Sequence, residues 1–383
     1  MMTQGKTRVT FLKIFRNQTG FLLIAALTLL ASLTLLGATA YILSSTDIKI
    51  GGNFKTSQMT LQVAMAGAER ARELLRQENL AAGDSTTFSD ELNNATRKGA
   101  NGVLNGYSAT TDDAALASGN MNNNHVTYAA YLTNDSADGS SNTTDSNGEV
   151  LITSVATGPN NAKAQVQIVV AAYTSPSSPA VVYSKGDVTG NGSSLTIDGN
   201  DACGAGAALA PIYTKDPATT NLNGSPTLSG NPPTPQHGTV DFDIESYIDS
   251  LKTGATTLTE DTSDETYGGT SNYVTLYSDT SDPPNVNGLK LQNVTGYGIL
   301  LVKGDLVLGG GFEWNGVIYA TGSITLNGGG GNAINISGLI FSGTSTVTDI
   351  TINGGNTLRY DSCKVKKAAA TQPLELVNWK QVY

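Results

Sequence analysis

The segment DVTGNGSSLTID, residues 187–198, carries oxygen-bearing side chains at the spacing of a calcium-binding loop. The candidate ligands, at positions 1, 3, 5 and 12 of such a loop, are Asp187, Thr189, Asn191 and Asp198. Position 6 is glycine, as these loops require, but position 12 is Asp rather than the usual bidentate Glu. Because the flanking residues have strand character, the alternative is an Asn/Gly turn between two strands. No cofactor is required by this pattern, and calcium is the one candidate.

Side chains that could support catalysis are few and scattered. The two histidines, His125 and His237, are not spaced to pair with a Ser or Cys nucleophile or with zinc ligands. The acidic and basic groups that a polysaccharide-degrading β-helix would need could come only from Lys303, Asp305, Asp349 and Arg359. Surface charges on turns explain these four residues better. We therefore predict that the chain is not an enzyme.

The candidate residues lie in a region that repeats itself. GILLVKGDLVLGG from residue 298, GVIYATGSITLNGG from 316 and GLIFSGTSTVTDITINGG from 338 share one plan, which AVVYSKGDVTGNG from 180 begins in the same way. Repeats of about 20 residues made of strands and turns are typical of a β-solenoid, and a β-sandwich is the alternative. The side chains expected to point into the solenoid are Ile299, Leu301, Leu306, Leu308, Val317, Tyr319, Ile324, Leu326, Leu339, Phe341, Ile350 and Ile352.

The remaining pattern predicts an α+β chain in several parts. Residues 81–175 are expected to form a small antiparallel β-meander, with strands in 125–174 and a short helix near 90–95. TSPSSP at 174–179 marks a boundary, and residues 176–383 form the mainly β unit. Residues 200–290 are expected to interrupt its repeats. Within them, residues 241–252 have the spacing of a helix capped by Asp241.

The N-terminal segment is long and apolar. Phe21 to Leu43 would span roughly 34 Å as a helix, enough to cross a bilayer core of about 30 Å. Four cations and no acidic residue precede the run. This charge bias favours an N-terminus in the cytoplasm and places the chain after the apolar run outside the cytoplasm. A cleaved secretory signal would have a shorter apolar run. Helical spacing continues after residue 53, so we expect one helix over 21–80, apolar first and amphipathic later.

The stretch from Gly20 to Leu75 resembles the N-terminal region of PilX-type minor pilins and related type IV pilin-like proteins. The resemblance rests on the basic leader, the junction of Gly20 and Phe21, the uncharged run, GGN at 51–53 and VAMAGAERA at 63–71. It implies that residues 1–20 are a leader, which a prepilin peptidase cuts off between Gly20 and Phe21, and that Phe21 is then methylated. The chain as a whole, with its Gly-rich strands and with Trp379 and Lys380 near the C-terminus, also resembles longer PilX-like proteins.

One position departs from the pattern of the major pilins. The family usually has glutamate at the fifth mature position, which is Ala25 here. An ammonium group buried without that carboxylate would cost several kcal/mol, so a repeated shaft subunit is disfavoured. The resemblance instead implies a minor component of a type IV pilus or a type II secretion pseudopilus. Such a component initiates the filament or is located at its tip. Its partners would be the peptidase, other pilins, the assembly machinery and the inner membrane. The alternative is a membrane-anchored adhesin whose solenoid binds glycans or surfaces.

The net charge and the cysteines indicate which class of partner and which compartment to expect. The formal charge moves from −10 to −14 when the leader's four cations are lost, which excludes a nucleic-acid binder that neutralises phosphates. Cys203 and Cys363 both lie in the extracytoplasmic part, where a disulfide is expected. Such a bond would close a loop of about 160 residues and stabilise the fold by roughly 4–5 kcal/mol at most.

Overall fold

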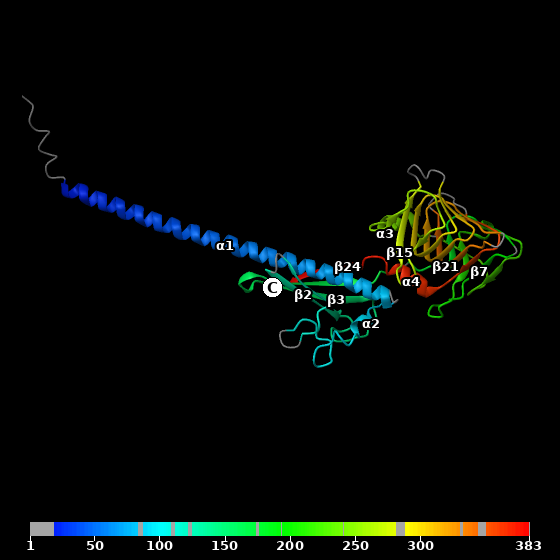
Figure 1. Ribbon diagram of the computed structural model, residues 1–383, viewed down its shortest axis with the longest axis horizontal. Coiled ribbons are helices and arrows are strands. Elements are labelled where there is room, and N and C mark those ends of the chain that lie inside the picture. Colours follow the sequence, from blue (N-terminus) through cyan, green and yellow to red (C-terminus); the bar gives the residue numbers. More distant parts are fainter. Residues whose placement is uncertain are drawn as a thin grey trace, which may run out of the picture.

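The computed structural model describes residues 19–82, 87–108, 112–121, 125–173, 176–192, 194–239, 241–280, 288–329, 332–343 and 350–382. The predicted leader falls outside these ranges except for Thr19 and Gly20. The α+β class is confirmed: one long helix leads to a small antiparallel sheet and then to a large β region (Figure 1).

Helix α1, Thr19–Ala82, is continuous over 64 residues, or roughly 96 Å at 1.5 Å per residue. Its second half packs on a sheet through small residues, and Ala64, Ala68 and Ala71 are almost fully buried. Gly67 marks the closest approach, because a Cβ there would overlap the ring of Tyr128. The expected single helix, apolar first and amphipathic later, is therefore found.

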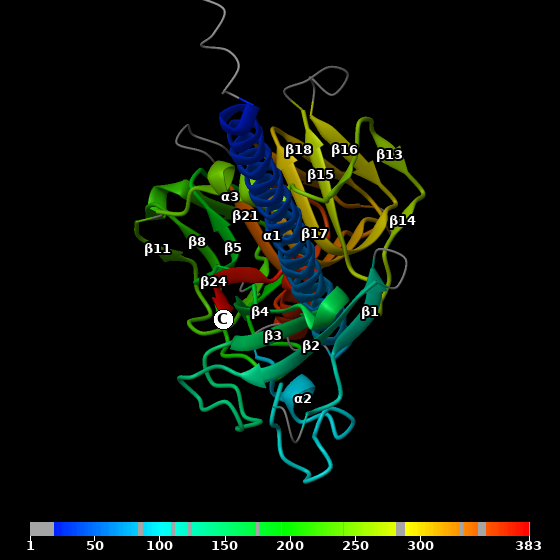
Figure 2. The ribbon, with the colours of Figure 1, turned by 90° about the vertical axis from the view of Figure 1, so that its left-hand side faces the viewer.

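A five-stranded antiparallel sheet lies beside this half of α1 (Figure 2). Its strands are β1 (Ala117–Met121), β2 (Val126–Asn134), β3 (Glu149–Thr157), β4 (Lys163–Ala171) and β24 (Glu375–Val382), in that order. The short helix α2, Ser89–Leu92, lies on the connection from α1. Strands β2 to β4 were expected from the sequence, whereas β1 and β24 were not.

Strand β24 changes the division of the chain. Its residues pair antiparallel with β4, from Glu375 opposite Ala171 to Val382 opposite Gln165. The predicted unit 176–383 therefore does not run to its C-terminal end, because its last strand belongs to the five-stranded sheet. The β region between Ala171 and Glu375 is thus an insertion between two neighbouring strands of one sheet.

The inserted region is a parallel β-solenoid, since every named strand pair within its two sheets is parallel. Among the described residues, the twelve-stranded sheet contains β5 (Ala180–Ser184), β7 (Thr196–Asp198), β8 (Ala210–Thr214), β10 (Thr227–Ser229), β11 (Gln236–His237), β12 (Thr256–Thr257), β14 (Thr266–Tyr267), β15 (Val274–Asp279), β17 (Thr295–Lys303), β19 (Glu313–Ala320), β21 (Asn335–Ser342) and β23 (Thr357–Arg359). The seven-stranded sheet contains β6 (Val188–Asn191), β9 (Thr220–Asn223), β13 (Thr262–Ser263), β16 (Leu289–Gln292), β18 (Leu306–Gly309), β20 (Ile324–Asn327) and β22 (Ile350–Asn353).

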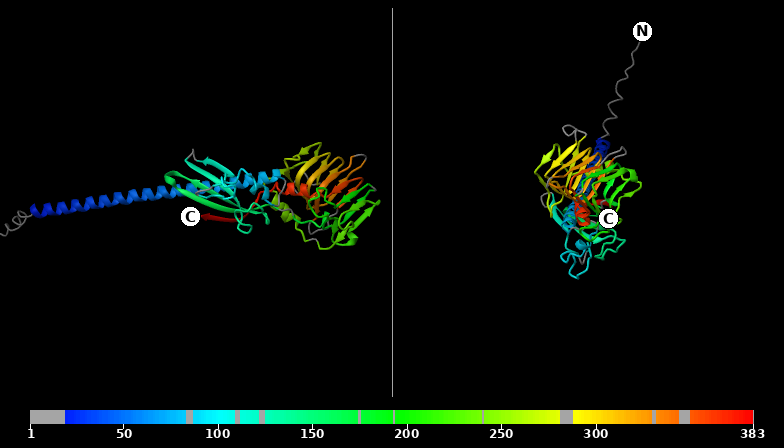
Figure 3. Two further views of the ribbon diagram at one scale, coloured as in Figure 1. Left: turned by 90° about the horizontal axis from the view of Figure 1, so that it is seen from below. Right: turned by 90° about the vertical axis from the view of Figure 1, so that its right-hand side faces the viewer.

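The rungs, each one turn of the solenoid, do not stack in chain order. The first rung, β5 and β6, pairs with the last, β21 and β22, and on its other side with β8 and β9. Residues 200–290, expected to interrupt the repeats, thus supply rungs at both ends of the stack, through β8 and β9 and through β15. Figure 3 shows these strands stacked beyond the C-terminal end of α1.

Glycines form one corner of the stack. Gly298, Gly316 and Gly338 lie in register on β17, β19 and β21, with φ of +133°, +142° and +151°. A Cβ at Gly316 or Gly338 would overlap the carbonyl oxygen of the glycine on the preceding rung. The repeat glycines of the sequence therefore bend each long strand where side chains do not fit.

The predicted inward set is correct for one sheet and wrong for the other. Leu306, Leu308, Ile324, Leu326, Ile350 and Ile352 of the seven-stranded sheet lie in the solenoid core. In the twelve-stranded sheet the core is lined instead by Leu300, Val302, Ile318, Ala320 and Ile340. Their neighbours Ile299, Leu301, Val317, Tyr319, Leu339 and Phe341 point outward and are buried in a second cluster. Both faces of these strands are covered, so the sequence shows no alternation to reveal the direction.

Two helices cover that outer face. Helix α3, Ile244–Leu251, contributes Ile244, Ile248 and Leu251, and helix α4, Ser362–Ala369, contributes Val365 and Ala368. The N-cap of α3 is Asp243, whose carboxylate accepts a hydrogen bond from the Ser246 amide at 3.2 Å. The predicted cap, Asp241, is two residues too early. Two short 3₁₀ turns, Pro159–Asn161 and Pro217–Thr219, complete the elements.

Candidate functional site

The first half of α1 is a long apolar surface that no described part of the chain covers. Its large side chains, with exposed fractions of 59–76%, are Phe21, Leu22, Leu23, Ile24, Leu27, Leu29, Leu30, Leu33, Leu35, Leu36, Tyr41, Ile42, Leu43, Ile48, Ile50 and Phe54. By length and composition alone, the helix could cross a membrane: its mean hydropathy reaches 2.3 in the most apolar window, and none of that window is buried. Such a surface needs lipid or other apolar helices around it.

The hydroxyl groups on this surface are compatible with an apolar surrounding. Thr28 donates to the carbonyl of Ala25 at 2.9 Å, Ser32 to Thr28 at 2.8 Å, and Thr34 to Ala31 at 2.9 Å. Thr39 and Thr46 donate in the same way to carbonyls one turn earlier. These five hydroxyl donors are thus satisfied within the helix itself, as a medium without water requires.

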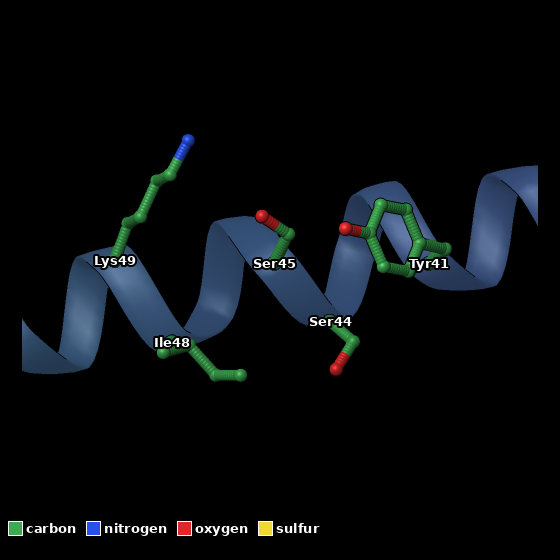
Figure 4. A pocket seen from close by; sticks show the side chains of 5 residues that line it. All are labelled: Tyr41, Ser44, Ser45, Ile48 and Lys49. Carbon is green, nitrogen blue, oxygen red and sulfur yellow. The ribbon is translucent and has the colours of Figure 1, made fainter.

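The apolar surface ends where charges begin. The first carboxylate after Phe21 is Asp47, and the first cation is Lys49. Figure 4 shows Lys49 and Ser45 pointing to one side of the helix, and Ser44 and Ile48 to the other. Tyr41 lies two turns before Lys49 and is 76% exposed. A tyrosine followed by a lysine is typical of the interface between an apolar layer and water.

The predicted processing residues lie at the far tip of this surface. Gly20 is helical, and a Cβ there would meet nothing within 4 Å. Among the described residues, neither packing nor backbone geometry therefore requires glycine at position 20. Phe21 is 74% exposed, and Ala25, one turn on, is exposed and apolar.

The other end of α1 is fixed to the solenoid. Arg76 forms an ion pair with Glu73 at 2.7 Å and donates to the carbonyls of Ala370 and Thr371 at 3.3 Å. Arg72 donates to the carbonyl of Leu374 at 3.2 Å, so α1 holds the segment that leads from α4 into β24.

Apolar packing strengthens the same junction. Leu80 at the end of α1 and Tyr173 just after β4 pack against the outer cluster of the twelve-stranded sheet. The rings of Tyr173 and Tyr247 lie 6.4 Å apart, and those of Tyr247 and Tyr319 lie 5.1 Å apart. Burial raises the pKa of Tyr247 above its ordinary value, so its hydroxyl stays neutral. The solenoid and the five-stranded sheet are thus joined by apolar contacts as well as by the arginine hydrogen bonds.

The predicted disulfide is present. Cys203 and Cys363 are bonded, with Cα atoms 5.8 Å apart across a sequence separation of 160. Asp201 holds the same corner, because its carboxylate accepts hydrogen bonds from the amide and hydroxyl of Ser362 and from the amide of Gly206. Partial burial opposes ionisation of Asp201, but these hydrogen bonds prevail and lower its pKa to about 2.

The calcium-loop residues do not form one loop. Thr189 and Asn191 lie on β6 in the seven-stranded sheet, whereas Asp198 lies on β7 in the twelve-stranded sheet. The Asp198 carboxylate accepts hydrogen bonds from Ser229 at 2.7 Å and from Asn200, and it faces Arg359 at 3.6 Å. The backbone oxygen of Asp187 accepts from Ile350 in the rung stack. The segment is thus strand, corner and strand.

Other candidate ligands and catalytic groups are also in use within the structure. In the described ranges, the one cluster with three potential metal ligands is Cys203, Asp361 and Cys363, but its sulfur atoms form the disulfide. Lys303 pairs with Glu245 at 2.9 Å, and Asp305 accepts from Ser323 at 2.7 Å. Asp349 lies outside the described residues.

Comparisons with known proteins add little. No protein-family model matches the chain, and no curated protein matches it. Among solved structures, the competence-associated pilin ComZ from Thermus thermophilus aligns over 85% of this chain and 98% of its own, with 11% sequence identity and a TM-score of 0.23. A TM-score this low carries no argument about this chain.

Proposed function

We propose that the chain is a pilin-like structural component of a type IV pilus or of a related type II secretion pseudopilus. The observation that carries the proposal is α1: one unbroken helix, uncovered and apolar over its first half, and packed on an antiparallel sheet over its second. Other apolar helices in a filament core, or the inner membrane before assembly, would cover the first half. The sheet and the solenoid would then lie outside the cytoplasm.

Processing is part of the proposal. A prepilin peptidase would cut between Gly20 and Phe21, and Phe21 would be methylated as the new N-terminus. A requirement of the peptidase would account for the glycine at position 20, because no described residue of the chain imposes one.

The test compares two glycines on the same exposed helix. Gly20→Leu should leave the leader attached, and intact-mass spectrometry should then find residues 1–20 in the membrane fraction. Gly37→Leu is the matched control, since a Cβ at Gly37 also meets nothing within 4 Å. The control should be cut normally. A native protein that begins at Met1 or Met2 would refute the pilin-like assignment.

Within the filament, we assign the protein to the tip or to initiation. Ala25 supplies no carboxylate for a neighbour's terminal amine, and an unpaired buried ammonium would cost several kcal/mol at every contact along a shaft. A tip subunit has neighbours on one side only, so it avoids this cost. The solenoid also extends beyond the C-terminal end of α1, where the next shaft subunit would have to pack (Figures 1 and 3).

Antibodies against the solenoid test the position separately from the processing. Immunogold labelling of intact filaments should decorate one end of each filament, and sparsely. Labelling spread along the shaft would remove the tip assignment while leaving the pilin-like assignment in place.

A further inference from the structure

Within the described residues, the outer side chains on four strands of the seven-stranded sheet are exposed or half-buried. Helices α3 and α4 pack on β17 and β19, which belong to the twelve-stranded sheet. On β20, β22 and β6, residues buried in the core alternate with residues on the outer face that are exposed or half-buried, and on β9 half-buried residues alternate with exposed ones. These four neighbouring strands are parallel and in register, so their outer side chains form straight rows.

The rows have an unusual composition. The successive strands contain the triplets TLN, TIN, TGN and NLN. The first and third residues of each triplet lie on the outer face. One row contains Thr325, Thr351, Thr189 and Asn221, and the other contains Asn327, Asn353, Asn191 and Asn223. We call these eight residues the Thr/Asn ladder. No member of the ladder ionises, although the whole chain has a formal charge of −10.

Three pairs of side chains within the ladder are hydrogen-bonded to each other. The amide of Asn353 donates to the side-chain oxygen of Asn327 at 3.1 Å, and that of Asn223 donates to Asn191 at 3.2 Å. The hydroxyl of Thr189 lies 3.4 Å from that of Thr351. Side chains held in this way lose little rotamer entropy when they bind a ligand. Each asparagine keeps a further donor or acceptor for a ligand.

We propose that the Thr/Asn ladder binds a neutral, extended polysaccharide laid along the solenoid axis. Successive rungs present hydroxyl and amide groups about every 4.8 Å, so a polymer of neutral hydroxyl-bearing units laid along this axis meets a similar set of contacts at each rung. The two rows are about 6.7 Å apart, so a sugar ring can reach both. Nucleic acids and anionic glycans need cations, which the ladder lacks. This activity is independent of the proposed filament role.

The experiment uses the full chain in detergent micelles, with swollen cellulose and chitin as probes. The wild-type protein should co-sediment with at least one of them, and the bound fraction should not fall as salt is raised, because no charge takes part. Heparin and double-stranded DNA should not bind. Asn353→Arg places a bulky cation in the middle of the ladder and should weaken binding about tenfold or more, equivalent to about 1.4 kcal/mol.

Two further variants separate binding from folding. Thr351→Val removes one hydroxyl and keeps the side-chain shape, and should also weaken binding. Thr357→Arg is the matched control, because Thr357 is an exposed strand residue on β23 of the other sheet, and it should bind like the wild type. Failure of the wild type to bind both probes, loss of binding with salt, or equal loss in Thr357→Arg would overturn the proposal. So would a preference for heparin or DNA.

Discussion

The stacked glycines make the sharpest prediction about stability, and Gly316→Ala is the change that tests it. Gly316 has φ of +142°, and an added methyl group would overlap the carbonyl oxygen of Gly298. On another side it would lie 3.1 Å from the Cβ of Ala368 in α4. Strands β17 and β21 pair with β19 on both sides, so the backbone has little freedom to move away.

The size of the effect follows from two terms. A side chain at such a φ costs about 1–3 kcal/mol, and overpacking against fixed backbone costs about 1–3 kcal/mol more. We expect the free energy of unfolding to fall by about 4 kcal/mol. For a unit of this size, that corresponds to a melting temperature lower by about 8–16 °C.

Thermal unfolding of the full chain in detergent, followed by circular dichroism, measures this. The control is Gly269→Ala, where a Cβ meets nothing within 4 Å and φ is not in the left-handed region. The control should unfold within about 1 kcal/mol of the wild type. If Gly316→Ala melts at the temperature of the control, the glycine stack is not a steric requirement and the reasoning fails.

Three other changes test the stability of the fold by thermal or urea unfolding. Cys203→Ser should lower the melting temperature, with a loss of up to about 4–5 kcal/mol, and the wild type in reductant should match it; an unchanged midpoint would contradict the bond's role. Asp201 has its pKa lowered from 3.8 to about 2 in the folded protein, so its contribution to stability is complete above about pH 4 and lost as the pH falls toward 2. Urea midpoints across this range should show that loss in the wild type and a flatter curve in Asp201→Asn. Asp243→Ala removes the N-cap of α3 and should lower the free energy of unfolding in urea by about 1 kcal/mol. Asp241→Ala should change it little. If Asp241 were the cap, the two variants would show the opposite order.

The sequence predicts local structure well where one face alone is buried. Helix α1 and strands β2 to β4 show the expected periodicities, and the glycine repeats indicate the rungs. The direction of Ile299 and Tyr319 could not be predicted in the same way, because helices that come from other parts of the chain cover the outer face of their strands. An apolar run buried on both sides looks the same in either register.

Long-range pairing is the second limit. Strand β24 contains Leu376, Val377 and Trp379, which remain 44–48% exposed, so its sequence gives no strong sign of burial. Its partner β4 ends about 200 residues earlier, and nothing local connects them. Of the candidate sites, the cysteine pair could be predicted from compartment and number, whereas the Thr/Asn ladder required the register of four strands. The triplets TLN, TIN and TGN were the available signal for it.

The return of β24 to the first sheet has a consequence for biogenesis. As the chain emerges from its N-terminus, β4 is complete long before its neighbour exists, and its edge stays open until the last residues arrive. That edge carries the apolar sequence VQIVVA, whose unpaired backbone groups are a template for pairing with other chains. If the chain is exported as proposed, the whole solenoid crosses the membrane during this interval. Truncation after Leu374 would leave the β4 edge permanently unpaired, whereas in the complete chain the eight-residue strand β24 pairs with it.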